Sequence, residues 1–141
     1  MKHLQIVDKT NQKKEFSKSI LVKSGQKLNF ETLTKIKSSK TKGNIFIKAV
    51  VMPNSSLTLR GLIKVYPKLN QVEAFLKHVI LLVGKNSTAV SIPELEIDSN
   101  DVKVSHSSTI GQIDPEQLFY LMSRGLTYSA SVKLIIKSFL S

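Results

Sequence analysis

Apolar and polar residues alternate along most of the chain up to about residue 106, a pattern that predicts short β-strands. The alternation is clearest in 45–51, 57–65 and 72–82, where apolar residues recur with a period of two and one strand face is expected to be buried. In 72–82 the other face is also apolar, as at Phe75 and Leu81, so this strand is expected to be covered on both sides. Further strands are predicted at 4–7, 19–23, 28–36, 93–98 and 102–106, with a turn at 99–100 and a polar loop at 37–44.

After residue 113 the apolar period becomes helical. Asp114 is a good N-cap, Pro115 suits the first helical position, and Gly125 marks the end of this helix. The apolar stripe of the helix consists of Leu118, Leu121 and Met122. A second helix is predicted from Thr127 to Leu140, with an inner face of Val132, Ile135, Ile136 and Phe139. A β-rich body followed by two helices favours an α+β or β-solenoid arrangement over a doubly wound sheet.

The composition is that of a globular domain of 141 residues. Cysteine is absent, which excludes disulfides, thiolate metal ligands and cysteine nucleophiles. No run of about 18 apolar residues occurs, so no membrane span is expected. The first residues lack the continuous apolar stretch of a secretory signal, and the cytoplasm is therefore the expected location.

The net charge of +11 is concentrated in the first half of the chain. Residues 1–70 carry fifteen Lys and Arg against three acids, whereas residues 71–141 carry six against seven. This asymmetry indicates either an anionic partner, with nucleic acid as the obvious candidate, or a solvated lysine-rich face. Arg60 and Arg124 are the only arginines, and no helix-turn-helix or RNP motif is present. We therefore favour the solvated face and do not expect nucleic acid as a partner.

The segment "SIPELEIDSNDVKVSHSSTIGQIDPEQLFYLMSRGL", from Ser91 to Leu126, resembles the C-terminal core of the SufB/SufD family, the scaffold subunits of the SUF system of iron–sulfur cluster assembly. The residues that match the family pattern are Pro93, Leu95-Glu96-Ile97, Asp101-Val102-Lys103, Ser105-His106, Thr109, Gly111, Asp114 and Leu118 to Gly125. The upstream stretch "GLIKVYPKLNQVEAFLKHVILLVG" is similar as well. The resemblance covers 57–141 and fades before residue 57.

The resemblance implies a mainly β fold, a right-handed parallel β-helix (β-solenoid) over 1–112 that is capped by a C-terminal α-helix pair over 113–141. Stacked coils agree with the alternating strands, because a single coil cannot bury its apolar edge alone. The resemblance also implies a non-enzymatic scaffold that docks a SufC-type ABC ATPase through its helical end. This scaffold would pair with a second SufB/SufD-like subunit or form a homodimer. The alternative is a basic nucleic-acid-binding or purely structural module on the same fold.

The chain departs from the family pattern where cluster ligands are expected. SufD-like sequences carry cysteine just before the Ser-His pair, where this chain has Val104. SufB-like sequences flank the histidine with glutamates, where this chain has Ser105 and Ser107, and a SufB-like cysteine corresponds loosely to His78. Only histidines remain as candidate ligands. We therefore expect no cofactor on this chain alone, with an iron–sulfur cluster at a shared subunit interface as the alternative.

His106 and His78 are the candidate metal or cluster-interface residues. In a regular strand His106 shares the face of Val102 and Val104, so it is either a buried imidazole satisfied by a neighbouring hydroxyl or a nitrogen ligand at a subunit interface. His78 shares the face of Leu76 and has the same two interpretations. If stacked coils bring the two histidines together, they form a two-histidine site that a second subunit would complete.

No catalytic residue is assigned. A triad of Ser105 or Ser108 with His106 and Asp101 can be written, but no strained G-x-S-x-G elbow presents the serine. A group of acids on one strand face consists of Glu94, Glu96 and Asp98. It is either a cation site with oxygen ligands or, as we favour, the solvated side of a strand.

The helical segment has large side chains beyond those of its predicted apolar stripe. They are Phe119, Tyr120 and Arg124, and they are the candidate partner-docking residues. Tyr and Arg are common anchors of protein interfaces, which supports docking of the ATPase. The other interpretation is that these residues only stabilise the helix pair. Arg124 would complement the dipole at the end of its helix, and Tyr120 would lie at the rim of the core.

Overall fold

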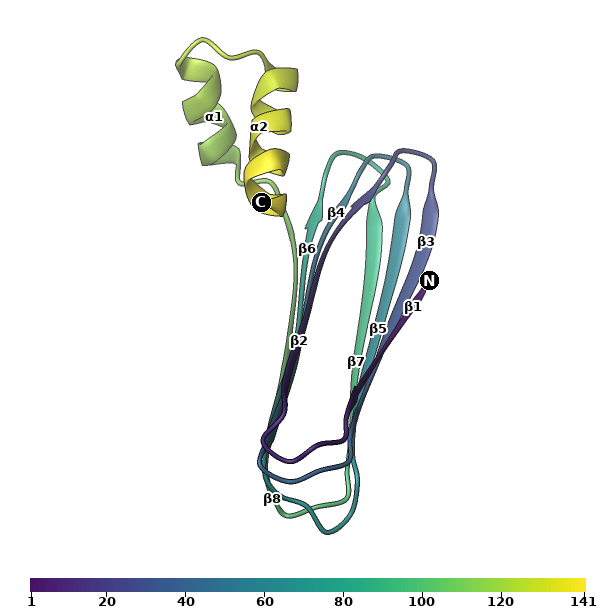
Figure 1. The fold of residues 1–141 in the computed structure, drawn as a ribbon. Coiled ribbons are helices and arrows are strands. Elements are labelled where there is room, and N and C mark those ends of the chain that lie inside the picture. Colours follow the sequence, from purple (N-terminus) through teal and green to yellow (C-terminus); the bar gives the residue numbers. More distant parts are fainter.

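The computed structural model describes residues 1–141, with eight strands followed by two helices (Figure 1). The strands are β1 (Lys2–Val7), β2 (Lys13–Val22), β3 (Lys27–Ile36), β4 (Thr41–Val51), β5 (Ser56–Val65), β6 (Asn70–Leu82), β7 (Thr88–Ile97) and β8 (Asp101–Gln112). The helices are α1 (Pro115–Ser123) and α2 (Tyr128–Leu140). The predicted order of strands first and helices last is confirmed.

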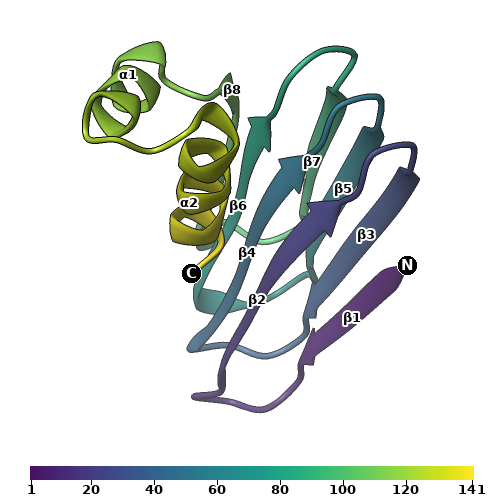
Figure 2. The same cartoon turned by 90° about the horizontal axis from the view of Figure 1, so that it is seen from above.

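Two parallel sheets face each other, as the view from above shows (Figure 2). One sheet has the order β1-β3-β5-β7 and the other has the order β2-β4-β6-β8. The chain alternates between the sheets, so each coil contributes one strand to each of them. Lys2 pairs with Glu31 and Lys13 pairs with Lys42, so one coil takes about 30 residues. The protein is therefore a parallel β-solenoid of four coils, and the predicted solenoid with two C-terminal helices is confirmed.

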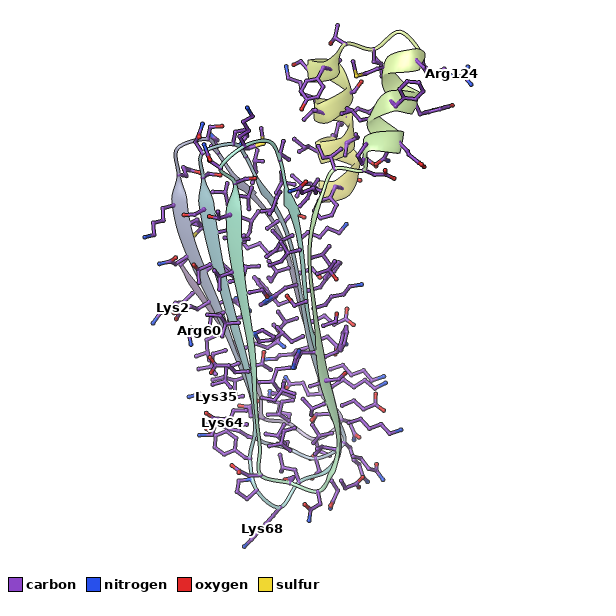
Figure 3. All side chains as sticks on the ribbon, turned by 180° about the vertical axis from the view of Figure 1, so that it is seen from behind. Lys2, Lys35, Arg60, Lys64, Lys68 and Arg124 are labelled. Atoms are coloured by element: carbon purple, nitrogen blue, oxygen red, sulfur yellow. The ribbon has the colours of Figure 1, made fainter.

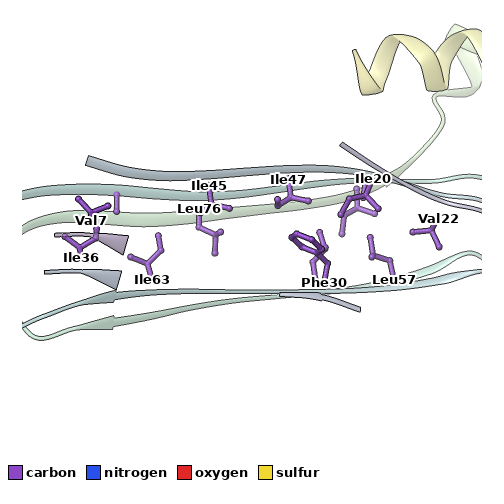
Figure 4. Packing of buried hydrophobic residues seen from close by; sticks show 14 of the residues in the cluster. Val7, Ile20, Val22, Phe30, Ile36, Ile45, Ile47, Leu57, Ile63 and Leu76 are labelled. Atoms are coloured by element: carbon purple, nitrogen blue, oxygen red, sulfur yellow. The ribbon is translucent and has the colours of Figure 1, made fainter. Parts of the chain in front are cut away.

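The main core lies between the two sheets and contains 17 buried hydrophobic residues (Figure 4). It includes the alternating apolar residues of the clearest predicted strands, for example Ile47, Leu59 and Leu76, each of which is 0% exposed. Side chains alternate between the two faces of a strand, so the apolar set points inward and the polar set points outward. This packing confirms the buried faces that the period of two predicts.

Several predicted strand limits are wrong. β4 already begins at Thr41, inside the predicted loop 37–44, while β2 begins at Lys13 and β8 continues to Gln112. The added residues are mostly polar, and they are held by the hydrogen-bonded ladder of the neighbouring coil. A ladder satisfies backbone groups whatever the side chains are, so hydrophobic alternation alone understates the strand length.

The second face of β6 is only partly covered. Phe75 is 38% exposed, which contradicts the expected burial of this face, whereas Leu81 is 9% exposed. Leu81 belongs to a second core of five buried residues, consisting of Val50, Leu81, Val83, Val132 and Ile135. The helices thus cover only the end of β6 that lies next to them, as Figure 1 shows.

Both helices begin and end as the sequence predicts. An Asp114 carboxylate oxygen accepts from the Glu116 backbone N–H at 2.9 Å, and the Thr127 hydroxyl accepts from the Ala130 N–H at 3.1 Å. Gly125 has a φ of 95°, the left-handed conformation that ends a helix. The predicted stripe of α1 is only partly correct, since Met122 is 43% exposed. Neither helix has the length and apolar character that a membrane crossing requires.

Two polar contacts fasten the end of α2 to the solenoid. The Ser19 hydroxyl of β2 donates to the Leu140 carbonyl at 3.1 Å. The Lys48 ammonium of β4 donates to the Ser141 carbonyl at 3.0 Å, and it also lies 6.0 Å from the ring centroid of Phe139. Cations are favourable at the C-terminal end of a helix, so Lys48 stabilises the attachment electrostatically as well.

Candidate functional site

The last coil brings the two candidate histidines to neighbouring strands of one sheet. In the register of β6 and β8, Leu76 pairs with His106 and His78 pairs with Ser108. Leu76 and His78 are 0% and 1% exposed, so this face of the sheet points into the solenoid. The two histidines therefore lie on the inward face, one coil apart.

His78 is enclosed by a hydrogen-bonded bridge between the two sheets. Its Nδ1 atom lies 2.8 Å from Oγ of Ser91 on β7, and the Ser108 hydroxyl of β8 donates to Ser91 Oγ at 2.7 Å. The other ring nitrogen of His78, Nε2, is buried and has no hydrogen-bond partner. His78 is thus a nearly buried imidazole with one oriented nitrogen and one unsatisfied nitrogen.

Burial lowers the pKa of His78 from 6.5 to about 4, and repulsion by His106 contributes to the same shift. His78 is consequently neutral near pH 7. A neutral imidazole is the form that binds metal ions, but the bridge of Ser91 and Ser108 separates this ring from solvent. In the present arrangement His78 fits the structural interpretation better than that of an accessible ligand.

His106 occupies the inward face but is exposed. Of the two interpretations of His106, the imidazole buried in the core does not apply, because β8 pairs only with β6 and no further coil covers it in this chain. The chain instead leaves the solenoid after Gln112 and enters α1. His106 therefore stands at the open side of the last coil, where another molecule can reach its ring.

The structure does not assemble the Ser-His-Asp triad that can be written from the sequence. Ser108 is engaged with Ser91, and a carboxylate oxygen of Asp101 accepts from the Gln71 backbone N–H at 3.2 Å. The Ser-His contact that does exist, between Ser91 and His78, includes no carboxylate. A histidine with a pKa of about 4 is also a weak general base near neutral pH.

Two of the three acids on this strand face, Glu94 and Glu96, form ion pairs, and the face does not form a cation site. Glu94 lies 2.7 Å from the Arg60 guanidinium, and a carboxylate oxygen of Glu96 lies 3.8 Å from the Lys64 ammonium. No group of three or more His, Asp or Glu side chains is arranged to hold a metal ion. The residues present therefore do not fit a complete iron–sulfur cluster site within one chain, since His106 offers a single exposed imidazole and no thiolate exists.

The helix pair presents the remaining candidate residues on its outer surface. Phe119 is 74% exposed and Tyr120 is 55% exposed, and the Arg124 guanidinium lies 5.2 Å from the centre of the Tyr120 ring. Figure 3 places Arg124 at the outer end of α1, away from the solenoid. These side chains are free of the second core, so the folded chain leaves an aromatic and cationic surface open to another molecule.

Sequence reasoning missed Ser91 as a partner of His78. The two residues belong to different sheets and are 13 positions apart. The contact arises because β6 and β7 face each other across the interior, and only the coiling of the chain determines which positions of facing strands meet. Ser91 is half-buried, and the alternation of apolar residues on its face of β7 does not indicate which residue of β6 it meets.

The fold and the site together define a class of protein. It is a parallel β-solenoid with an attached helix pair, whose candidate binding residues lie at the open last coil and on the exposed helices. Within this class, the chain belongs to the SufB/SufD family, because the model of the "SUF system FeS cluster assembly, SufBD core domain" family matches residues 3–139. The family match starts well before residue 57, so the limit of the resemblance inferred from sequence motifs was too narrow.

Individual relatives agree with this assignment. The iron-sulfur cluster assembly protein SufD of Escherichia coli (strain K12) is 37% identical over 92 residues, which are 65% of this chain and 22% of the relative. The protein of the same name from Bacillus subtilis (strain 168) is 29% identical over 126 residues, 89% of this chain and 29% of the relative. A SufBD family protein of Synechocystis is 29% identical over 99 residues, 70% of this chain and 21% of the relative. The chain thus spans less than a third of the length of these curated relatives.

Proposed function

We propose that this chain acts as a non-enzymatic scaffold component of iron–sulfur cluster assembly, and that its helix pair docks a SufC-type ABC ATPase. The observation that carries the proposal is the exposed aromatic surface of α1 on a chain that belongs to the SufB/SufD family. The exposed rings of Phe119 and Tyr120, beside Arg124, add little to the stability of the helix pair itself. Such side chains are typical anchors of protein interfaces.

The attachment of α2 supports a mechanical role for the helix pair. Movement of a docked ATPase would act on the solenoid through the second core and through the contacts of Ser19 and Lys48 with the end of α2. These contacts involve β2 and β4, and the core involves β4 and β6. Displacement of the helices would therefore be transmitted to the sheet that carries His78 and His106.

The open last coil is the proposed interface with a second SufB/SufD-like subunit or with a second copy of this chain. β7 and β8 are edge strands whose outer backbone groups have no strand partner in this chain, and such edges favour pairing. His106 would contribute one nitrogen ligand at this interface, and the cluster, as cargo, would take its thiolates from the partner. The absence of cysteine supports this division of roles.

Co-purification with a SufC-type ATPase tests the docking step. The variant Phe119→Ala, Tyr120→Ala, Arg124→Ala is expected to lose at least tenfold in recovered ATPase, because truncation of an interface anchor typically costs about 2 kcal/mol or more. A matched control is Leu21→Ala, Val90→Ala, which truncates exposed apolar residues of the solenoid that are 44% and 53% exposed. Equal recovery with the helix variant, the control and the wild type would refute docking through α1.

Sedimentation equilibrium tests the pairing step separately. Ile110 of β8 is 43% exposed on the open coil, and Ile110→Lys would place a charge in the proposed interface. We expect this variant to weaken self-association or association with a SufB-like subunit, while the docking of the ATPase is unchanged. Unaltered association would show that the last coil is not the interface.

A further inference from the structure

Eight lysines gather at the end of the solenoid that lies opposite the helices. They are Lys9, Lys13, Lys35, Lys37, Lys40, Lys42, Lys64 and Lys68, and together they are the lysine band. All of them lie in or beside the β1–β2, β3–β4 and β5–β6 turns, which the parallel register stacks on one another. Figure 3 shows Lys35, Lys64 and Lys68 along this edge, with Arg124 at the far end of the molecule.

The register places like charges side by side within the lysine band. Lys35 pairs with Lys64 in one sheet, and Lys13 pairs with Lys42 in the other. Ammonium groups on neighbouring strands repel each other. This repulsion raises the free energy of the folded protein as long as no anion is bound to the band. The ammonium groups of Lys37 and Lys64 each lie 5.3 Å from the ring centre of Tyr66, so both lysines gather around this side chain.

Carboxylates neutralise little of this charge. Lys42 is paired with Glu73 at 3.0 Å and Lys64 with Glu96 at 3.8 Å. The other six lysines of the band have no ion pair with a carboxylate. The band ends at the fourth coil, where the corresponding turn carries Asp98 and Asp101. Within this row of turns, the excess of positive charge therefore lies in the first three coils, where Asp8 is the only carboxylate of the turns themselves.

We infer that the lysine band binds the phosphate backbone of a single-stranded nucleic acid without sequence preference. Lysine is a point charge that attracts phosphate, and phosphate contacts supply affinity but no sequence information. The band contains no arginine, because Arg60 lies in the middle of β5, paired with Glu94, and Arg124 is the C-cap of α1. The sequence alone did not lead us to expect nucleic acid, because arginine is scarce. That scarcity argues only against specific base recognition and is no obstacle to binding through phosphates.

The shape of the band selects a single strand over a duplex or a membrane. The band runs from Lys35 and Lys64 on one sheet, around the turns, to Lys13 and Lys42 on the other sheet. A flexible strand can follow this corner, whereas duplex DNA has a persistence length of about 150 base pairs and resists such bending. No exposed large hydrophobic residue lies in the three turns, so nothing there would insert into a lipid bilayer.

Nucleic-acid binding would use a surface separate from both parts of the proposed scaffold function. The helix pair attaches at the opposite end of the strands (Figure 1). His106 lies on the fourth coil, outside the lysine band. Loss of the lysine band is therefore not expected to affect co-purification of the ATPase.

Fluorescence anisotropy of a labelled 20-nucleotide oligo(dT) with the full chain tests the inference. The variant Lys37→Gln, Lys40→Gln, Lys68→Gln removes three exposed lysines of the band. We expect its Kd to rise about tenfold or more and the salt slope, log K against log salt, to fall by about 2, because each lost phosphate contact removes about 0.7. A mixed-sequence oligonucleotide of the same length should bind with similar affinity.

The matched control is Lys23→Gln, Lys27→Gln, Lys85→Gln, which removes the same charge from exposed lysines at the other row of turns. The inference requires the control to retain binding within about threefold of the wild type. Equal weakening of both variants would show that net charge alone is responsible and would overturn the inference. Absence of oligonucleotide binding at 0.1 M salt, or tighter binding to anionic phosphatidylserine vesicles that depends on Lys37, Lys40 and Lys68, would overturn it as well.

Discussion

His78 Nδ1 and Ser91 Oγ lie 2.8 Å apart and join the two sheets across the interior of the last coil. Ser91 is also bound by Ser108, so three side chains close this end of the solenoid above the main core. The contact orients the His78 ring and separates it from water. It explains how a titratable group can be buried beside apolar core residues such as Ile47 and Leu76.

Protonation of His78 should couple folding to pH. Its pKa is lowered from 6.5 to about 4 by burial, so between these values the unfolded chain binds a proton that the folded chain does not. The free energy of unfolding should therefore rise as the pH increases through this range. For His78 alone the loss between pH 7 and pH 5 is about 2 kcal/mol, measurable by urea unfolding at a series of pH values.

The control for this coupling is His78→Gln, which cannot titrate. Its stability should change by less than about 0.5 kcal/mol between pH 7 and pH 5, apart from contributions that both proteins share. Identical pH slopes for the wild type and the variant would contradict the depressed pKa.

Removal of the Ser91 hydroxyl should leave a buried ring with two unsatisfied nitrogens. Nε2 already lacks a partner, and Ser91→Ala would remove the partner of Nδ1. We expect a cost of about 1–3 kcal/mol in urea unfolding, because an unpaired buried polar group loses its full hydration. Ser108→Ala removes only the outer hydrogen bond of an exposed serine and should cost less than about 1 kcal/mol. A larger loss for Ser108→Ala would reverse the roles assigned to the two serines.

Gly61 should not tolerate a side chain. A Cβ atom at this position would lie 2.8 and 2.9 Å from the terminal carbons of Leu76 and 3.1 Å from Thr32 Oγ1. Leu76 is 0% exposed and has little room to move, so Gly61→Ala should destabilise the protein by about 1–3 kcal/mol. Gly111→Ala is the comparison, because no atom lies within 4 Å of its Cβ position, and it should change the stability by less than about 0.5 kcal/mol. Equal changes in stability for the two variants would mean that Leu76 and Thr32 can move aside to accommodate the added methyl group.

The helix pair should open without unfolding of the solenoid. Ile135 is 7% exposed and belongs to the second core, and Ile135→Ala should weaken that core by about 2–3 kcal/mol. Hydrogen exchange read by mass spectrometry should then accelerate in 115–140 while β4 and β5 remain protected. Leu59→Ala in the main core should accelerate exchange throughout the chain. A uniform acceleration by Ile135→Ala would show that helices and solenoid unfold as one unit.

Anaerobic reconstitution with iron and sulfide should leave this chain colourless when no partner is present. The chain has no cysteine and no group of three or more potential ligands, and the ring of His78 is enclosed. The iron content after desalting should be well below one atom per chain. A stable brown protein whose colour is lost in His106→Ala would show that histidine ligation suffices within one chain.

The helices and the inward strand faces could be predicted because their causes are local. Asp114, Pro115 and Gly125 define the limits of α1 through capping groups within a few residues of one another. The period of two in β4 and β5 specifies an inward apolar face in any stacked-coil arrangement. The choice of a solenoid from these strands came from the family resemblance.

The environment of each candidate residue depends on the stacking of coils. The sequence placed His78 and His106 on the same kind of inward face, and both are there. One is enclosed and the other is exposed because His78 lies beneath another coil, whereas His106 lies on the last one. Burial depends on the number of neighbouring layers, a quantity that no local pattern contains.

The sequence by itself determined the period of the strands, the positions of the helix caps, the absence of thiolate ligands and the excess of lysine in the first half. Only the tertiary structure decided that Ser91 meets His78, that Gly61 makes room for Leu76, and that lysines from three turns form one band. The physical reason is that coiling brings together residues that are distant in the sequence. Strands that face each other across the interior place Ser91 against His78 and Gly61 against Leu76, and the parallel register superposes residues about 30 positions apart, such as the lysines of the band.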